Sequence, residues 1–157
     1  MYPSDVRISI DDPKSADIVA LIAEHLSDMH ATSPAESVHA LDPAALTDPA
    51  VTFWSARSCA GVLLGVGALQ RHQEHMGEVK SMRTAQSFRG RGVAIAVLDV
   101  IVTECRTRGL REVNLETGTQ EYFSAARRLY VRYGFVSRGP FASYSDDANS
   151  AYFALAL

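Results

Sequence analysis

The spacing of apolar residues along the chain switches between two periods. Over residues 15–30 they recur every three or four positions, which predicts an amphipathic helix with Ser15 as its N-cap. Residues 91–109 and 122–134 show the same spacing, and each run ends at a glycine, a common helix-stop signal. Elsewhere, alternating positions and short apolar runs predict strands. The predicted strands cover residues 6–10, 51–57, 60–72, 78–85, 111–117, 135–138 and 150–157.

A further short helix is predicted directly after the first one. Ser33 has the residue type of an N-cap, Pro34 suits the first helical position, and Glu36 completes a capping box. The resulting order is strand, two helices, three strands, helix, strand, helix and two strands. This order predicts a single α/β domain with a mixed sheet over residues 1–157.

Composition and charge narrow the classes of function. The 157 residues are 47% hydrophobic and 21% charged, which is typical of a globular protein. The net charge of −3 argues against a nucleic-acid or membrane-surface partner. Residues 1–12 lack the apolar core of a signal peptide, and no apolar run is long enough to span a membrane, so we expect a cytoplasmic location. Cys59 and Cys105 are expected to be free thiols, with Cys105 buried.

Two glycines and two arginines stand directly before the longest predicted helix. Gly90 and Gly92 would let an anion approach the backbone N–H groups that are free at a helix N-terminus, and Arg89 and Arg91 add cationic donors. Because a predicted strand leads into this loop, the pattern indicates a pyrophosphate site. The alternative is an ordinary turn with solvated arginines. A nucleotide-hydrolysing P-loop and a dinucleotide fingerprint both require residues that are missing here.

The residues Arg89-Gly90-Arg91-Gly92-Val93-Ala94 resemble the R-x-x-G-x-G/A signature of GNAT-type N-acetyltransferases. A second segment, "AARRLYVRYGF" at 125–135, looks like the A-x-x-L-Y-x-x-x-G-F stretch of the same family. The resemblance implies a central mixed, mostly antiparallel sheet flanked by helices, with a splayed pair of central strands. It also implies acetyl-CoA as co-substrate. The sequence departs from the family at Phe123, where an asparagine that contacts the cofactor is common.

By this resemblance the strand before the loop pairs with the pantetheine arm of the cofactor and offers a backbone N–H to the thioester carbonyl. The loop itself would bind the pyrophosphate. The implied cofactor-binding residues are Met82, Arg83, Thr84, Arg89, Gly90, Arg91, Gly92, Val93, Ala94, Ser124 and Tyr130.

Tyr130 matches the tyrosine of the family and is predicted to be the general acid that protonates the leaving sulfur, with Tyr133 as the substitute. Glu78 and Glu116, on neighbouring predicted strands, are the candidate bases. Each could instead be a solvated carboxylate at a strand end, and no base is needed if the amine binds already neutral.

Acceptor binding is expected from His30, His39, Arg83 and Tyr144. A charged residue on a central strand is costly unless it is exposed or paired, so Arg83 would receive an acceptor carboxylate or form a salt bridge. His72, Glu74 and His75 lack the spacing of a zinc motif, and no metal is expected.

Together these observations predict an N-acetyltransferase that moves an acetyl group from acetyl-CoA to a primary amine of a small or amino-acid-like molecule. Transfer would be direct, within a ternary complex, and a homodimer is plausible for such a domain. Two alternatives are a transferase of another acyl group and a non-catalytic acyl-CoA-binding sensor.

Overall fold

The computed structural model describes residues 5–73 and 75–157 as one sheet with helices on both sides. The strands are β1 (Val6–Ile10), β2 (Val51–Ser58), β3 (Leu63–Arg71), β4 (Met76–Thr84), β5 (Glu112–Gly118), β6 (Val136–Arg138) and β7 (Ser150–Ala156). The helices are α1 (Ala16–Thr32), α2 (Val93–Thr107) and α3 (Ser124–Tyr133). The strands follow the order β1-β2-β3-β4-β5-β7-β6, and only the β4–β5 pair is parallel.

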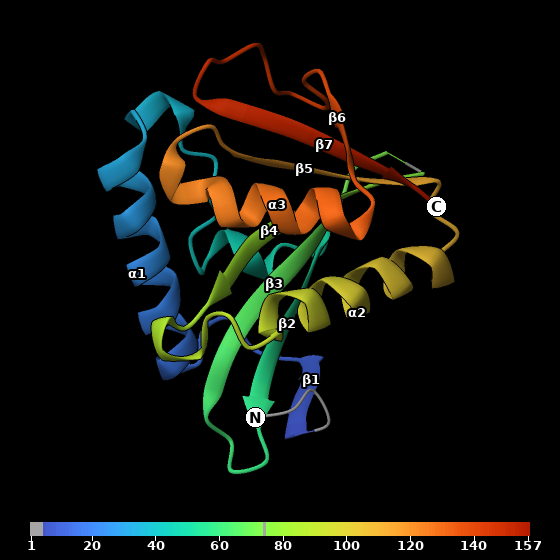
Figure 1. The fold of residues 1–157 in the computed structure, drawn as a ribbon. Coiled ribbons are helices and arrows are strands. Elements are labelled where there is room, and N and C mark those ends of the chain that lie inside the picture. Colours follow the sequence, from blue (N-terminus) through green and yellow to red (C-terminus); the bar gives the residue numbers. More distant parts are fainter. Residues whose placement is uncertain (1–4, 74) are drawn as a thin grey trace.

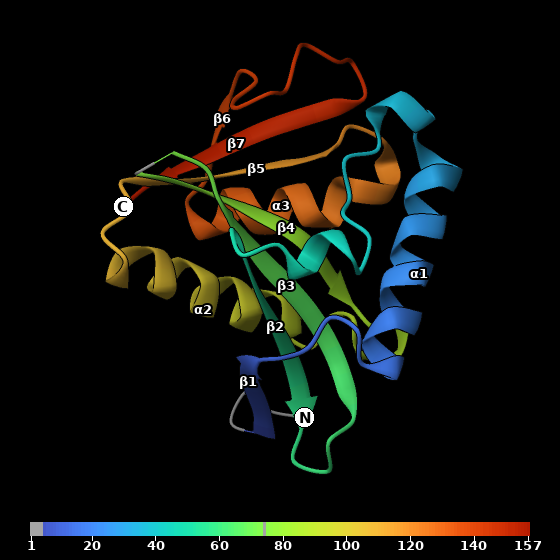
Figure 2. The same cartoon turned by 180° about the vertical axis from the view of Figure 1, so that it is seen from behind.

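Helices cover both faces of this sheet (Figure 1). Helix α1 packs on one face, and α2 and α3 pack on the other, as the view from behind makes clear (Figure 2). Neighbouring side chains of β2 point to opposite faces, as in any strand: Phe53 joins the core under α1, and Trp54 joins the core under α2. The sheet therefore separates two hydrophobic cores.

The two central strands separate partway along their length. β4 and β5 pair only from Met76–Val79 to Glu112–Leu115. Beyond Val79, β4 bonds only to β3, and a β-bulge there sets Ser81 and Met82 opposite the single residue Gly67. Ser81 has a φ of 55°, an uncommon value for a residue with a side chain. The bulge bends β4 away from β5 and opens the sheet between them.

The seven predicted strands and the three longer helices are confirmed, with ends that move by a few residues. The mixed, mostly antiparallel sheet with a splayed central pair is confirmed as well. No described helix is long and apolar enough to cross a membrane.

The predicted helix beginning at Ser33 is wrong, because the structure has only a 3-10 turn at Ala35–Ser37. α1 continues to Thr32, and Ser33 becomes its C-cap, with extended dihedrals and its N–H bonded to Met29 O. The residue that would start a second helix therefore ends the first one.

The bulge depends on a small residue opposite it. A Cβ at Gly67 would lie 2.6 Å from Val97 Cγ1 and 2.7 Å from Met82 Sδ. We expect Gly67→Ala to lower the free energy of unfolding by about 1–3 kcal/mol, since overpacking forces neighbours to shift. Gly139→Ala, where a Cβ meets nothing within 4 Å, is the control and should change stability by less than about 1 kcal/mol. Urea unfolding of both variants checks this, and equal effects would contradict it.

Candidate active site

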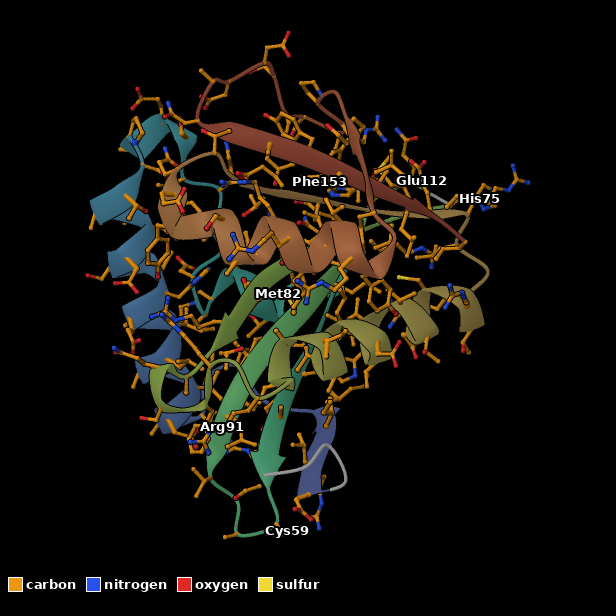
Figure 3. All side chains as sticks on the ribbon, in the orientation of Figure 1. Cys59, His75, Met82, Arg91, Glu112 and Phe153 are labelled. Atoms are coloured by element: carbon orange, nitrogen blue, oxygen red, sulfur yellow. The ribbon has the colours of Figure 1, made fainter. Side chains whose placement is uncertain are left out.

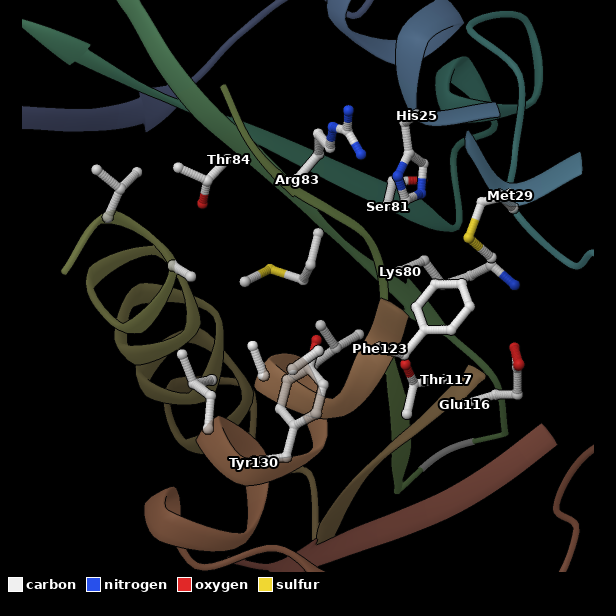
Figure 4. Close-up of a pocket in the computed structure, with 18 of the residues that line it drawn as sticks. His25, Met29, Lys80, Ser81, Arg83, Thr84, Glu116, Thr117, Phe123 and Tyr130 are labelled. Atoms are coloured by element: carbon white, nitrogen blue, oxygen red, sulfur yellow. The ribbon is translucent and has the colours of Figure 1, made fainter. Parts of the chain in front are cut away.

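A cavity of about 530 Å³ lies where β4 and β5 diverge. β4 from Glu78 to Thr84 forms one wall, and Glu116, Thr117 and the α3 residues form the other (Figure 4). The loop before α2 closes one end, while α1, His39 and Tyr144 line the other. The cavity thus joins the glycine loop to a group of titratable side chains.

Gly90 and Gly92 shape the loop end of this cavity. Their φ angles are 74° and 80°, in the left-handed region that favours glycine. A Cβ on Gly90 would meet nothing within 4 Å, so the backbone conformation, and not crowding, calls for glycine. The space in front of the loop is open to a ligand.

The backbone amides that follow these glycines are uncapped. The first bond into α2 runs from Ala96 N to Gly92 O, at 3.2 Å. Within the described chain, the amides of residues 92–95 donate to no protein acceptor, and no side chain caps the helix. Helix N-termini with free amides carry partial positive charge and attract anions. Arg89 is exposed beside these amides. The guanidinium carbon of Arg91 lies over the Phe88 ring, 5.6 Å from its centroid.

Tyr130 projects from α3 into the middle of the cavity and is 7% exposed (Figure 4). Burial, reinforced by the nearby charge of Glu116, raises the pKa of its hydroxyl to about 12. Tyr130 therefore keeps its proton at neutral pH. The other tyrosine considered, Tyr133, bonds to Asp99 Oδ1 at 2.6 Å and does not line the cavity.

The two candidate bases occupy different environments. Burial raises the pKa of Glu116 to about 7. A single hydrogen bond, donated by Ser150 Oγ at 3.3 Å, acts in the opposite direction. Glu78 is only 2% exposed, and both of its oxygens are occupied: Oε1 contacts His72 Nε2 at 2.7 Å, and Oε2 accepts from Tyr144 OH at 2.5 Å. The alternative of a solvated Glu78 is therefore wrong. Glu116 is the carboxylate with free acceptor capacity.

Residues 18–135 match the model of the Acetyltransferase (GNAT) family. The chain belongs to this family of acyltransferases. It is 44% identical to the "Uncharacterized N-acetyltransferase YsnE" of Bacillus subtilis (strain 168), over 94% of this chain and 97% of the relative. It is 43% identical to the "Uncharacterized N-acetyltransferase YedL" of Escherichia coli (strain K12), over 96% and 94%. An "IAA acetyltransferase" of Azospirillum brasilense is 36% identical, over 94% and 95%.

Solved structures show the same fold. A provisionally named acyl-CoA N-acyltransferase from Klebsiella pneumoniae superposes with a TM-score of 0.78 at 29% identity, covering 97% of both chains. A GNAT family acetyltransferase from Elizabethkingia anophelis, solved with acetyl-CoA bound, superposes with a TM-score of 0.67 at 13% identity, covering 98% of this chain and 99% of its own. The GNAT fold predicted from the sequence is thus confirmed.

In this acetyltransferase Arg83 forms the salt bridge that was one of its two predicted roles. It is 8% exposed, and its guanidinium contacts Glu24 at 2.5 Å and Asp28 at 2.7 Å, both from α1. It also donates to Tyr122 OH at 2.9 Å. Arg83 therefore joins α1 to β4, where two carboxylates compensate its charge, and its Nε alone has no partner among the described residues.

The remaining predicted site residues fall into two groups. His39 and Tyr144 line the cavity and contact each other edge to face, with ring centroids 4.9 Å apart. Met82, Thr84, Arg89, Gly90, Gly92, Val93 and Ala94 also line it. His30, Arg91 and Ser124 do not; His30 is exposed, and Ser124 Oγ bonds to Glu121 at 3.3 Å. Figure 3 labels Arg91 on the loop and Met82 on β4.

The cavity-lining residues that sequence reasoning missed include His25, Met29 and Lys80. His25 and Met29 are one helical turn apart on α1, so they lie on the same face of the helix, whereas His30 lies on another. Burial and the charge of Arg83 lower the pKa of His25 to about 4, so it is neutral at pH 7. Lys80 could have been found from the sequence, because a charged residue on a central strand is the same signal that singled out Arg83.

Of the residues considered and rejected as metal ligands, Glu74 lies outside the described residues.

Ser37 joins two segments at the end of the cavity that lies away from the glycine loop. Its hydroxyl donates to Asp147 Oδ2 at 2.5 Å, which joins the 3-10 turn after α1 to the loop before β7. His39 and Tyr144 lie beside this contact. This end of the cavity is therefore built from two irregular segments that are far apart in sequence.

The raised pKa of Glu116 predicts a pH-dependent stability. Its pKa is about 7 in the folded chain and near 4.5 when unfolded, so the native state binds the extra proton between these values. Stability from this group is full below about pH 4.5 and is lost as the pH rises through 7. We expect the free energy of unfolding to fall less between pH 5 and pH 8 in Glu116→Gln than in the parent, by on the order of 1–3 kcal/mol. Urea unfolding at the two pH values measures this difference.

Glu36→Gln, on an exposed turn, is the control for that experiment. It should keep the pH dependence of the parent protein. The same slope in Glu116→Gln and in the parent would contradict the assignment.

Proposed function

We propose that this acetyltransferase moves an acetyl group from acetyl-CoA to a primary amine of a small molecule, by direct transfer in a ternary complex. One observation carries the proposal. The uncapped amides of residues 92–95 open onto the same cavity that holds a protonated Tyr130 and a Glu116 of raised pKa. An anion site, an acid and a base then lie in one cavity, where the thioester and the amine would meet.

The loop and β4 suit the two parts of acetyl-CoA. The glycine loop would receive the pyrophosphate on its amides, with Arg89 adding charge. Beyond Val79 the β4 edge that faces β5 has no strand partner, so residues 82–84 are available to pair with the pantetheine arm. The similar Elizabethkingia anophelis structure, which holds acetyl-CoA, supports this choice of donor.

Acetyl-CoA supplies an electrophilic thioester when it is bound. Glu116 accepts a proton from the amine, which makes the nitrogen nucleophilic at neutral pH. A backbone N–H of residues 82–84 stabilises the negative charge that develops on the thioester oxygen. The Tyr130 hydroxyl then donates its proton to the departing sulfur.

The cysteines support direct transfer over a covalent enzyme intermediate. Cys105 is buried in the core under α2, and burial raises the pKa of its thiol to about 11. Cys59 is exposed at the turn between β2 and β3, far from the cavity (Figure 3). Neither thiol lines the cavity, so no cysteine is placed to carry the acetyl group there.

The role of the loop can be tested with two glycines at opposite ends of α2. Gly92 and Gly109 have φ angles of 80° and 73°, so alanine strains both by about 1 kcal/mol. We expect acetyl-CoA to raise the melting temperature of the parent and of Gly109→Ala. Gly92→Ala should bind it at least tenfold more weakly, because its Cβ obstructs the approach to the amides. No shift with the parent protein would overturn the donor assignment.

The role of Tyr130 can be tested by removing only its hydroxyl. We expect Tyr130→Phe to lower kcat about 10²–10⁴-fold with a mixture of primary amines, while the Kd of acetyl-CoA stays within threefold. The rate of transfer is measured as the release of the free thiol of coenzyme A. Tyr133→Phe is the matched control and should keep its rate; the reverse pattern would make Tyr133 the acid.

Two further results of that assay would change the proposal. Faster thiol release from succinyl-CoA or propionyl-CoA would identify another acyl donor. Binding of acetyl-CoA without thiol release from any amine would make the protein a sensor.

A further inference from the structure

The cavity wall formed by β4 carries two buried cations, and they differ in how well they are paired. Arg83 has two carboxylates and a tyrosine hydroxyl within 2.9 Å, and of its nitrogens only Nε has no partner among the described residues. Lys80, on the same strand, has a side chain that is 9% exposed. Its nearest partners are Tyr144 OH at 3.1 Å and Glu78 Oε2 at 3.4 Å.

These distances leave the Lys80 ammonium poorly compensated. A charge-assisted bond from an ammonium to a carboxylate normally measures about 2.7–2.9 Å. The Glu78 oxygen at 3.4 Å from Lys80 already accepts a 2.5 Å bond from Tyr144, and His72 occupies the other oxygen. Glu78 is therefore held by groups other than Lys80. A lysine has three N–H donors, and here the third has no partner within the described chain.

The next residue along β4 also has an unused donor. Ser81 Oγ is buried and has no hydrogen-bond partner among the described residues, although Ser81 lines the same cavity. Buried polar groups are nearly always bonded, so an unmet hydroxyl and an under-paired ammonium on consecutive residues of one cavity wall call for an oxygen-rich anion. The opposite wall carries Glu116, which suits an ammonium or amine.

Resting on the proposed function, we propose that Lys80 binds the carboxylate of the acceptor, with Ser81 assisting, and that the acceptor is an amino acid. The amino group lies toward Glu116, and the carboxylate lies toward β4. A phosphate is the poorer match, because a second negative charge would face Glu78 and Glu116, while among the described residues at this end of the cavity Lys80 is the one cation without a close carboxylate partner. Lys80 is then a specificity-determining residue.

The first test compares each amino acid with its own carboxamide as acceptor. The pairs share side chain and amine, and only the charge at the carboxyl end differs. The amine of a carboxamide loses its proton more readily, so intrinsic reactivity favours the amide. We expect at least one amino acid to be acetylated with a kcat/KM at least tenfold above that of its amide.

The second test removes one of the two lysines of the chain at a time. Lys80→Met should raise the KM of the preferred amino acid at least tenfold, change the KM of its amide less than threefold, and leave the Kd of acetyl-CoA unchanged. Lys14→Met, at an exposed position, should match the parent in all three of these measurements. If Lys80→Met does not fold, the comparison of acids with amides in the parent protein decides alone.

The outcomes separate this proposal from the function on which it rests. Equal or better acetylation of amides and simple amines, with acetyl-CoA binding intact, overturns the role of Lys80 and keeps the acetyltransferase function. Selectivity for the acid that survives in a folded Lys80→Met also overturns it. A protein that neither binds acetyl-CoA nor releases thiol overturns both.

Discussion

The site depends on the loss of pairing between β4 and β5 after Val79. A strand inside a sheet normally bonds to neighbours on both edges, and unbonded backbone groups are costly when buried. Here each strand keeps one neighbour, β3 or β7, so the fold stays intact while two facing edges are left without partners. The bulge at Ser81 turns β4 away, and Gly67 provides the room for it. A ligand can complete the hydrogen bonds that the sheet leaves unmade.

The two ends of the resulting cavity use different chemistry. The end near α2 offers mainly backbone groups, whose positions are fixed by glycine conformation and a helix terminus. The other end offers side chains that gain or lose protons. Glu78 and Glu116 stand on adjacent strands, yet they differ in the number of hydrogen bonds that each accepts. One carboxylate is tied into a network, and the other remains able to take a proton.

Sequence patterns predicted the parts of the molecule that local chemistry determines. Apolar periodicity located the strands and the three main helices, and the glycines and arginines of residues 89–92, between a predicted strand and a predicted helix, identified the loop. Other outcomes depended on distant residues. The salt bridge of Arg83 required knowing which face of α1 meets β4, and His25 lines the cavity where His30 was expected because five positions along a helix turn a side chain to another side. Ser33 matched a helix start and a helix end equally well.

The contact between Ser37 and Asp147 shows where this architecture is free to vary. The glycine-loop end of the cavity lies between β4 and α2, which the sheet holds in place. The opposite end rests on a 3-10 turn and a loop joined by one hydroxyl–carboxylate bond. Insertions or exchanges in those two segments can reshape this end without touching the sheet. Descendants of such a chain can therefore diversify one half of the cavity piecemeal while inheriting the other half unchanged.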